Sequence, residues 1–123
     1  MGKIYSKERN GAFMENVVKD LNDFLSDLNI FYRKLQNYHW NVTGPMFHQL
    51  HTLFETQYTD LAMAIDEIAE RIRALGFHAP ASYQDFIRLG KIKDETNQPK
   101  ADAMIKQLIA DQNIIVAKAH ELF

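Results

Sequence analysis

Apolar residues recur every three or four positions along most of the chain, which is the spacing of helices that bury one face. This stripe runs through residues 10–39 and again through residues 47–75, and residues 41–44 interrupt it. Pro45 suits the first turn of the helix that follows, and Gly76 suits the position just beyond its end. The pattern therefore predicts two long helices joined as an antiparallel hairpin. The residues expected to face inward are Phe13, Val17, Leu21, Phe24, Leu28, Phe31, Leu35 and Tyr38 in the first helix, and Phe47, Leu50, Phe54, Leu61, Ile65, Ile68, Ile72 and Leu75 in the second.

The rest of the chain predicts one short helix and a third long one. Ser82 is a suitable cap for a short helix over residues 83–89, which Gly90 would close. Pro99 begins the third long helix, and no segment reads as a strand. Three long amphipathic helices usually require a fourth. Since the chain stops at an apolar end, we expect either that it has been shortened or that a partner supplies the missing helix. The third helix is expected to turn inward Met104, Ile105, Leu108, Ile115, Leu122 and Phe123.

Composition narrows the function classes. The 123 residues suit a single domain and carry a net charge of -2, so no strong positive charge points to nucleic acid. The absence of cysteine removes disulfide frameworks, thiolate zinc sites and cysteine nucleophiles. The N-terminus lacks the apolar core of a signal peptide, and no run of about 18 apolar residues could span a membrane. A cytoplasmic location fits this composition.

A second stripe on the helix predicted over residues 47–75 carries groups that bind metals. His51, Glu55, Asp66 and Glu70 all fall within about 100° of helix rotation, apart from the apolar stripe. They form two pairs spaced i, i+4, so each pair can converge on one ion. The pairs cannot share an ion within one chain, because eleven residues, or about 16 Å of helix, separate Glu55 from Asp66.

Two copies of this helix would resolve that separation. If they pack antiparallel about a two-fold axis near Asp60, His51 and Glu55 of one copy face Asp66 and Glu70 of the other. Two such sites then form in each dimer, and the small residues between the pairs allow close approach.

His39 is expected to join the same site, because the turn folds the end of the first helix back beside His51. The resulting mixture of imidazole and carboxylate ligands suits iron, manganese or zinc. With iron, such a site could bind Fe(II) and pass electrons to an oxidant.

Each of these residues has a simpler explanation when it is taken alone. A single histidine is more often a surface residue, and Asp66 and Glu70 could form salt bridges with Arg71 or Arg73. His48 has no partner in this arrangement, and Trp40 could belong to an interface or to the core. Only the joint placement on one stripe favours a shared site.

One segment resembles the signature region of the Dps family, the twelve-subunit miniferritins. This segment reads YHWNVTGPMFHQLHTLFETQYTDLAMAIDEIAERIRALG and covers residues 38–76. The motif begins with His-Trp, and the second histidine, a carboxylate, an aspartate and a glutamate follow twelve, sixteen, twenty-seven and thirty-one residues after the first histidine. The matching residues are His39, His51, Glu55, Asp66 and Glu70.

The resemblance implies an all-α, ferritin-like helical bundle that assembles as a dodecameric cage. It also implies a di-iron ferroxidase centre between two subunits, with His39, His51 and Glu55 from one and Asp66 and Glu70 from its mate. Such proteins oxidise Fe(II), preferably with hydrogen peroxide, and store Fe(III), which protects the cell from oxidative damage. The chain departs from the pattern in two respects. It has Glu55 where the family usually has aspartate, and the fourth long helix is missing.

DNA binding is a separate expectation and is not favoured. Some relatives bind DNA through lysine-rich tails, whereas this N-terminus offers only Lys3, Lys7 and Arg9, with Glu8 among them. The alternatives to a ferroxidase are a non-enzymatic DNA-compacting protein with a weak iron site, and a purely structural helical interaction module.

Overall fold

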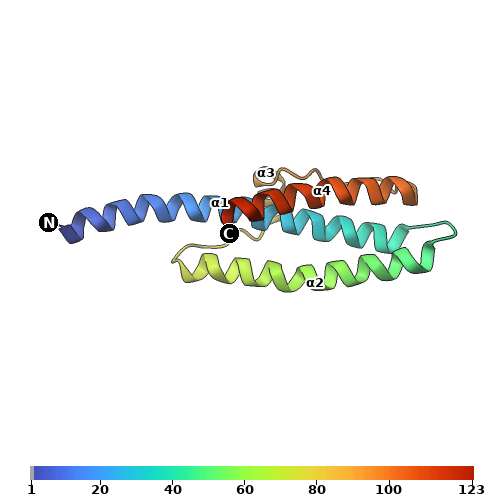
Figure 1. The fold of residues 1–123 in the computed structure, drawn as a ribbon, viewed down its shortest axis with the longest axis horizontal. Helices are drawn as coiled ribbons and strands as arrows, with labels where there is room; N and C mark the ends of the chain where they lie inside the picture. Colours follow the sequence, from blue (N-terminus) through green and yellow to red (C-terminus); the bar gives the residue numbers. More distant parts are fainter. Residues whose placement is uncertain (1) are drawn as a thin grey trace.

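The computed structural model describes residues 2–123, with side chains from Gly11 onward, and these residues form four α-helices (Figure 1). α1 spans Gly2–Asn41, α2 Phe47–Ala74, α3 Tyr83–Leu89 and α4 Ala101–Leu122. The described part of the chain contains no strand, which confirms the all-α prediction of three long helices and one short one. α1 begins before the predicted residue 10, because the polar residues ahead of it favour helix without adding to the apolar stripe. No described helix is both long and apolar enough to cross a membrane.

α1 lies at the centre of the bundle, and each of the other helices packs against it. In Figure 1, α2 and α4 both run alongside α1 and antiparallel to it. The N-terminal part of α1 extends beyond the ends of both neighbours (Figure 1). The prediction that Phe13 is buried was therefore wrong. Its side chain is 64% exposed, because no helix lies alongside that part of α1.

The buried apolar residues form two clusters along α1. Burial of a large apolar side chain contributes roughly 1.5–3 kcal/mol, so these clusters hold the three long helices together. α1 contributes to both clusters from more than one of its faces, as expected of the central helix. The cluster nearer the α1–α2 turn includes Ile30, Phe31, Leu35, Tyr38, Val42, Leu50, Phe54, Met104 and Leu108, and the other comprises Val18, Leu21, Phe24, Leu25, Leu28, Ile68 and Ile72.

The predicted ends of α2 and α3 are confirmed. Gly76 follows α2 with a φ of 93°, a conformation that favours glycine. The amide of Phe77 then donates to the carbonyl of Ile72 at 3.3 Å, which satisfies one of the last carbonyls of the helix. Ser82 caps α3, since its Oγ accepts a hydrogen bond of 3.2 Å from the amide of Asp85.

A buried ion pair, which the sequence pattern did not reveal, joins α1 to α4. Lys34 Nζ lies 2.6 Å from the Asp111 carboxylate, and the two side chains are only 2% and 3% exposed. Lys34 also donates to the carbonyl of Lys93 at 3.0 Å, and the Tyr38 hydroxyl donates to Glu95 at 2.8 Å. These contacts hold both α4 and the connector before it (residues 90–100) against α1.

A second polar contact fixes the start of that connector. The carboxylate of Asp27 accepts hydrogen bonds from the amides of Lys91 and Ile92, at 2.6 and 2.9 Å. Gly90 passes so close to α1 that an added Cβ would lie 2.7 Å from Ile30 Cδ1 and 2.8 Å from Asp27 Oδ1. Glycine is therefore required at this position to allow the close approach.

Some residues predicted to face inward are exposed. Phe47, Ile105 and Phe123 are 41%, 39% and 67% exposed, so their predicted burial was wrong. Phe47 lies at the first position of α2, and Ile105 lies about 100° around α4 from Met104, which packs on α1. A different exposed apolar residue, Val116, borders a groove of about 360 Å³ between α2 and α4. The described chain leaves this face of the bundle uncovered.

Candidate metal centre

The α1–α2 turn places the last turn of α1 beside the first turns of α2. Gly44 adopts a φ of 105°, and its carbonyl accepts a hydrogen bond of 3.1 Å from the amide of Phe47. Val42 is buried and anchors the turn in the core. Pro45 lies in the turn ahead of α2 rather than in the first turn of the helix.

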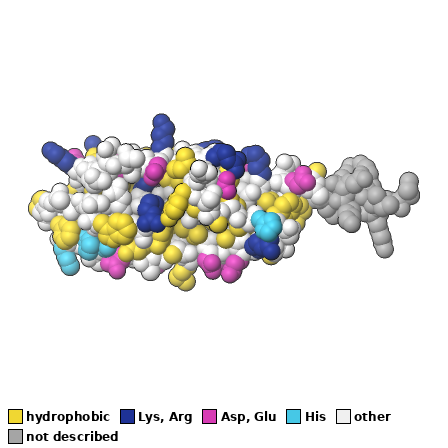
Figure 2. Space-filling view, turned by 180° about the vertical axis from the view of Figure 1, so that it is seen from behind, with side chains coloured by type: hydrophobic (Ala, Val, Ile, Leu, Met, Phe, Trp, Pro, Cys, Tyr) yellow, Lys and Arg dark blue, Asp and Glu magenta, His cyan; other side chains and the backbone are white. Residues whose placement is uncertain are grey.

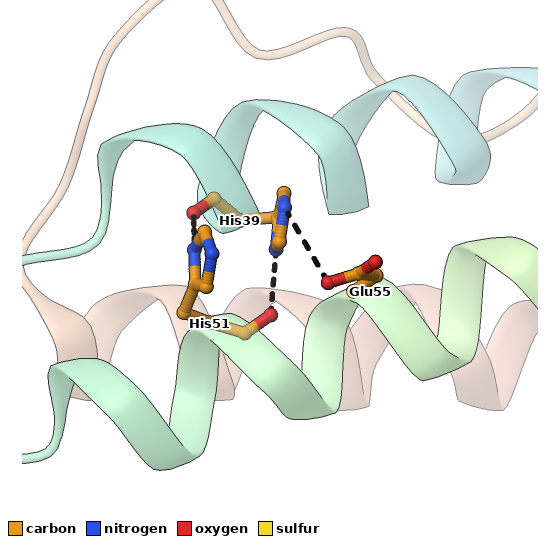
Figure 3. A group of neighbouring side chains, drawn as sticks. All are labelled: His39, His51 and Glu55. Atoms are coloured by element: carbon orange, nitrogen blue, oxygen red, sulfur yellow. Dashed lines mark hydrogen bonds and ion pairs between the residues drawn. The ribbon is translucent and has the colours of Figure 1, made fainter.

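His39, His51 and Glu55 come together at this end of the bundle, as Figure 3 shows. One ligand atom from each residue lies within 4.8 Å of the others. His39 is buried, His51 is half-buried and Glu55 is exposed, so the group opens to the surface from one side. The prediction that the turn returns His39 to the neighbourhood of His51 is confirmed.

The two imidazoles are oriented by each other's main chain. His39 Nδ1 donates to the carbonyl of His51 at 2.6 Å, and His51 Nδ1 donates to the carbonyl of His39 at 2.7 Å (Figure 3). A carbonyl oxygen only accepts, so the proton of each neutral ring lies on Nδ1. Both Nε2 atoms then carry a free lone pair, as metal-binding histidines require.

Aromatic contacts hold the two rings in place. The imidazoles of His39 and His51 stack with centroids 3.7 Å apart and planes 15° from parallel. Phe47 stacks on His51 at 5.0 Å, and Tyr58 meets His39 edge-on at 5.3 Å. The rings therefore have little freedom to rotate away from the orientation that the hydrogen bonds set.

Glu55 lies at a distance from His39 that allows one metal ion to bind both side chains. Its Oε2 lies 4.0 Å from His39 Nε2, and its side chain is 56% exposed. That separation is too long for a hydrogen bond, but two metal–ligand bonds of roughly 2 Å each can span it. Two imidazole nitrogens and one carboxylate supply three ligands, which leaves positions open for further donors.

Asp66 and Glu70 do not join this group within one chain. Both are exposed on α2, and eleven residues, or about 16 Å of helix, separate Glu55 from Asp66. Neither forms a hydrogen bond or an ion pair with another side chain in the described part of the protein. Arg73 instead donates to the carbonyl of Phe77, and Arg71 lies over the ring of Phe123. The structure therefore does not contain the salt bridges considered for these two carboxylates.

The surface around His39, His51 and Glu55 is apolar as well as polar. Histidine side chains gather at the end of the molecule that carries the α1–α2 turn, with apolar side chains beside them (Figure 2). Trp40 is 59% exposed, so it does not belong to the core of this chain. Met46 and Leu53 are also exposed near the turn and the start of α2, whereas His48 is an exposed residue outside the ligand group.

Sequence reasoning missed the groups that orient the two imidazoles. Backbone carbonyls accept from both imidazoles, and a carbonyl is present at every residue, so no residue type marks this role. Tyr58 carries a weak signal, because it lies three residues after Glu55 and therefore on a neighbouring part of the same helix face.

Comparison with known proteins places this chain in a family. The family model described as a ferritin-like domain matches residues 18–123. The chain is 34% identical over 104 residues to DNA protection during starvation protein 2 of Bacillus anthracis, covering 85% of this chain and 71% of that protein. It is 37% identical over 102 residues to a DNA protection during starvation protein of Porphyromonas gingivalis, covering 83% and 64%. Across the most similar curated relatives, the chain spans between 46% and 71% of their length.

Solved structures show the same fold. A Dps protein from Bacillus brevis superposes with a TM-score of 0.86 at 31% identity, covering 90% of this chain and 74% of that one. The Dps protein of Vibrio cholerae O1 gives 0.85 at 30% identity, covering 89% and 69%. The latter is described as a member of a broad superfamily of ferritin-like diiron-carboxylate proteins. The prediction of a ferritin-like helical bundle is confirmed.

Proposed function

Because the chain belongs to the Dps family of ferritin-like proteins, we propose that it is a miniferritin subunit that binds Fe(II), oxidises it and stores Fe(III). The observation that carries this proposal is the group of His39, His51 and Glu55, in which one ligand atom from each residue lies within 4.8 Å of the others. In this group the hydrogen bonds from Nδ1 leave the Nε2 atom of both imidazoles free. Oxidation and storage would remove both peroxide and the Fe(II) that converts peroxide to hydroxyl radicals. The chain would thereby protect the cell from oxidative damage.

The complete site forms between two copies of the chain. Asp66 and Glu70 are exposed, and neither side chain has a hydrogen-bond or ion-pair partner among the described residues. Both lie on the same stripe of α2 as His51 and Glu55. Antiparallel packing of two α2 helices about a two-fold axis brings the carboxylates of one copy to the imidazoles of the other. Thr59 and Ala62 lie between the two pairs and are small enough to allow close approach. Each dimer then holds two equivalent sites.

The donor set fits iron as the substrate. Two imidazoles with three carboxylates form a mixed nitrogen and oxygen set, which binds iron and also accepts zinc or manganese as substitutes. Glu70 is the carboxylate assigned to bridge two ions, which brings both within reach of one oxidant molecule. Glu55 stands where relatives usually have aspartate, and its extra methylene allows the carboxylate to reach farther from α2.

Two bound Fe(II) ions supply the two electrons that hydrogen peroxide requires. Each Fe(II) loses one electron, and the peroxide takes up both electrons together with two protons from solvent to give two molecules of water. No hydroxyl radical is released, because the oxygen–oxygen bond receives both electrons at one site. The role of the protein groups is to hold both ions at one site, so that peroxide receives two electrons together and is not reduced by one electron at a time.

The assembled form is proposed to be a homo-oligomeric cage of twelve subunits, in which the oxidised iron is stored. This assembly is a property of the whole protein, and the chain spans 71% or less of the length of its curated relatives. The apolar groove between α2 and α4 is a surface that such an assembly would need to cover. DNA binding is possible but not favoured on the sequence, and the side chains of Lys3, Lys7 and Arg9, on which that prediction rests, lie outside the described residues.

Anaerobic addition of Fe(II), followed by hydrogen peroxide, tests the proposed function. We expect two Fe(II) oxidised for each peroxide consumed, with the absorbance of Fe(III) appearing in the protein fraction. Asp66→Ala and Glu70→Ala are expected to abolish the oxidation, while His48→Ala serves as a control that retains it. Retardation of DNA without any Fe(II) oxidation would favour the DNA-compacting alternative. A purely structural module would bind no iron, and these substitutions would change nothing.

A further inference from the structure

An exposed apolar stripe, which we name the α4 stripe, runs along α4 to its C-cap residue. Its members are spaced alternately by four and three residues, which is the spacing of helices that pack side by side in coiled coils. The four large apolar members are between 39% and 67% exposed, so no described element covers them fully. The α4 stripe comprises Ile105, Ile109, Gln112, Val116, Ala119 and Phe123.

The α4 stripe forms one side of the groove between α2 and α4. Gln112 and Val116 line the groove of about 360 Å³, and a second groove of about 460 Å³ lies farther along the same two helices, beside Phe123. On the α2 side, Ala64 and Ala74 line these grooves with small side chains that leave room beside the stripe. Because α2 and α4 both run antiparallel to α1, they are parallel to each other and offer a third helix a straight groove.

The spacing of the α4 stripe is the same in both directions about residue 114. Two copies of α4 that pack antiparallel about a two-fold axis at that level therefore pair every member of one stripe with a member of the other. Ile109 then faces the small Ala119 of the second copy, and Ile105 faces its Phe123. Pairing a large with a small side chain allows the two helices to approach closely, as a well-packed interface requires.

Gln112 is the one polar member of the α4 stripe, and it lies next to the proposed axis. In this pairing it faces Val116 of the second copy, and the two Gln112 residues are separated by about 6 Å along the axis of the helices. Their long side chains can span that separation, so each amide can hydrogen-bond the other. A single polar residue in such a stripe favours one register over its alternatives.

We propose that the face formed by α2 and α4 is a homodimer interface, in which α4 of a second copy lies antiparallel along the groove. By symmetry, α4 of the first copy fills the groove of the second. The eighteen-residue step from Ile105 to Phe123 makes the face about 27 Å long, and two adjacent helices make it roughly 20 Å wide. Two such faces bury roughly 1,000 Å², which reaches the size expected of a specific interface.

This interface is separate from the contact between two α2 helices that is proposed for the metal centre. At about 100° per residue, the α2 residues that line the grooves lie about 140° around the helix from His51, Glu55, Asp66 and Glu70. One chain can therefore make both contacts at once, and two different two-fold contacts join chains into an assembly larger than a dimer. The inference goes beyond the proposed function and does not depend on it.

Sedimentation velocity of the 123-residue chain over a range of concentrations tests the interface. Ile109→Glu places a charge within the α4 stripe, where burial without a partner is unfavourable, so the mass of the assembly should fall at least twofold. Ile87→Glu is the matched control, because Ile87 lies on α3 and is 52% exposed, against 53% for Ile109. The control should sediment as the unmodified protein does, and circular dichroism should show equal helix content in all three proteins.

A disulfide measures the register directly, because the chain contains no cysteine of its own. The double variant Ile109→Cys with Ala119→Cys should form a covalent dimer on oxidation, since the proposed pairing places the two positions opposite each other. Within one chain the two cysteines cannot meet, because ten residues of helix, or about 15 Å, separate them. The single variant Ile109→Cys is the control and should remain unlinked, because its counterpart in the second copy lies about 15 Å away along the helix.

Three results would overturn the proposal. The first is an unmodified chain whose mass equals that of Ile109→Glu at every concentration. The second is a double cysteine variant that forms no covalent dimer although the unmodified chain associates. The third is a groove occupied by a different helix, from another protein or from a segment following residue 123 in a longer chain, which would keep the two cysteines apart.

Discussion

His39 and His51 each donate a hydrogen bond from Nδ1 to the other's backbone carbonyl, at 2.6 and 2.7 Å. Each imidazole therefore links α1 to α2 with one nitrogen and offers the other nitrogen to a metal. The two roles belong to different atoms of one side chain, so they can be separated by substitution.

His51→Asn is predicted to keep the structural role and lose the metal role. An asparagine amide places its donor near the position of Nδ1 but has no counterpart of Nε2. We expect His51→Ala to destabilise the fold by about 1 kcal/mol, the net value of a typical hydrogen bond. His51→Asn should lose less stability than His51→Ala. Both variants should weaken zinc binding by more than roughly tenfold, since even outer-shell changes at metal sites reach that size.

Urea denaturation and zinc titration calorimetry measure the two effects separately. His48→Ala is the control, because His48 is an exposed histidine three residues earlier on the same helix. Equal stability of the alanine and asparagine variants would contradict the structural role of the Nδ1 bond. Unchanged zinc affinity in either variant would contradict the role of Nε2.

Two inactive variants are predicted to complement each other when each lacks a ligand from a different half of the proposed two-chain site. In a mixed dimer of His51→Ala and Asp66→Ala chains, the two defects fall in one site and leave the other site intact. Random pairing of equal amounts makes half the dimers mixed, so we expect about a quarter of the original ferroxidase activity from two inactive parents. Iron oxidation measured after unfolding the mixture and refolding it together provides the test.

A pair of defects in the same half supplies the matched control. His51→Ala mixed with Glu55→Ala should restore nothing, because every site in a mixed dimer then lacks one ligand. Native mass spectrometry of mass-labelled chains verifies that mixed dimers have formed. Activity in this control mixture, or none in the first mixture despite mixed dimers, would show that the site is not shared between two chains.

The helices could be read from the sequence because their apolar stripes bury against one another. The pattern located α3 to the residue and the ends of α2 to within one residue. It failed for Phe13 and Ile105, since periodicity shows that a face is apolar but not whether a neighbouring helix reaches it. It also missed Lys34 and Asp111, whose pairing depends on how two distant helices align.

The meeting of three candidate metal ligands could be predicted for a different reason. An i, i+4 spacing and a tight turn are local features, so His39, His51 and Glu55 were expected to meet and do meet. The hydrogen bonds that orient the imidazoles could not be predicted, because their acceptors are backbone carbonyls. The assignment of Asp66 and Glu70 to a second copy remains a prediction.

Breaking the buried ion pair is predicted to destabilise the bundle strongly. Lys34→Met leaves the carboxylate of Asp111 buried without its 2.6 Å partner, which costs roughly 3–5 kcal/mol. Adding Asp111→Leu should recover most of that loss, because two apolar side chains can replace a buried pair. The control is Lys19→Met, whose 3.1 Å pair with Asp23 is on the surface and is worth about 1 kcal/mol or less. Urea denaturation that shows equal losses for Lys34→Met and Lys19→Met would contradict this prediction.

The carboxyl group of Asp27 is predicted to stabilise the fold more at low pH than at neutral pH. Burial raises the pKa of Asp27 above its ordinary value of 3.8, although hydrogen bonds from the amides of Ile92 and Lys91 oppose the shift. The folded state therefore holds the proton more tightly than the unfolded state does. The contribution of this group to stability is complete below the ordinary pKa and is lost as the pH rises through the folded pKa.

Asp27→Asn removes this titration while keeping an oxygen that accepts from the same two amides. We therefore expect the free energy of unfolding of the variant, relative to the unmodified protein, to increase as the pH rises from about 3 to about 7. Urea denaturation at several pH values measures the difference, and carboxyl carbon NMR of Asp27 follows the titration directly. A difference that stays constant with pH would mean that the pKa of Asp27 is the same in both states. A difference that falls with pH would mean that the amide hydrogen bonds outweigh burial and lower the pKa instead.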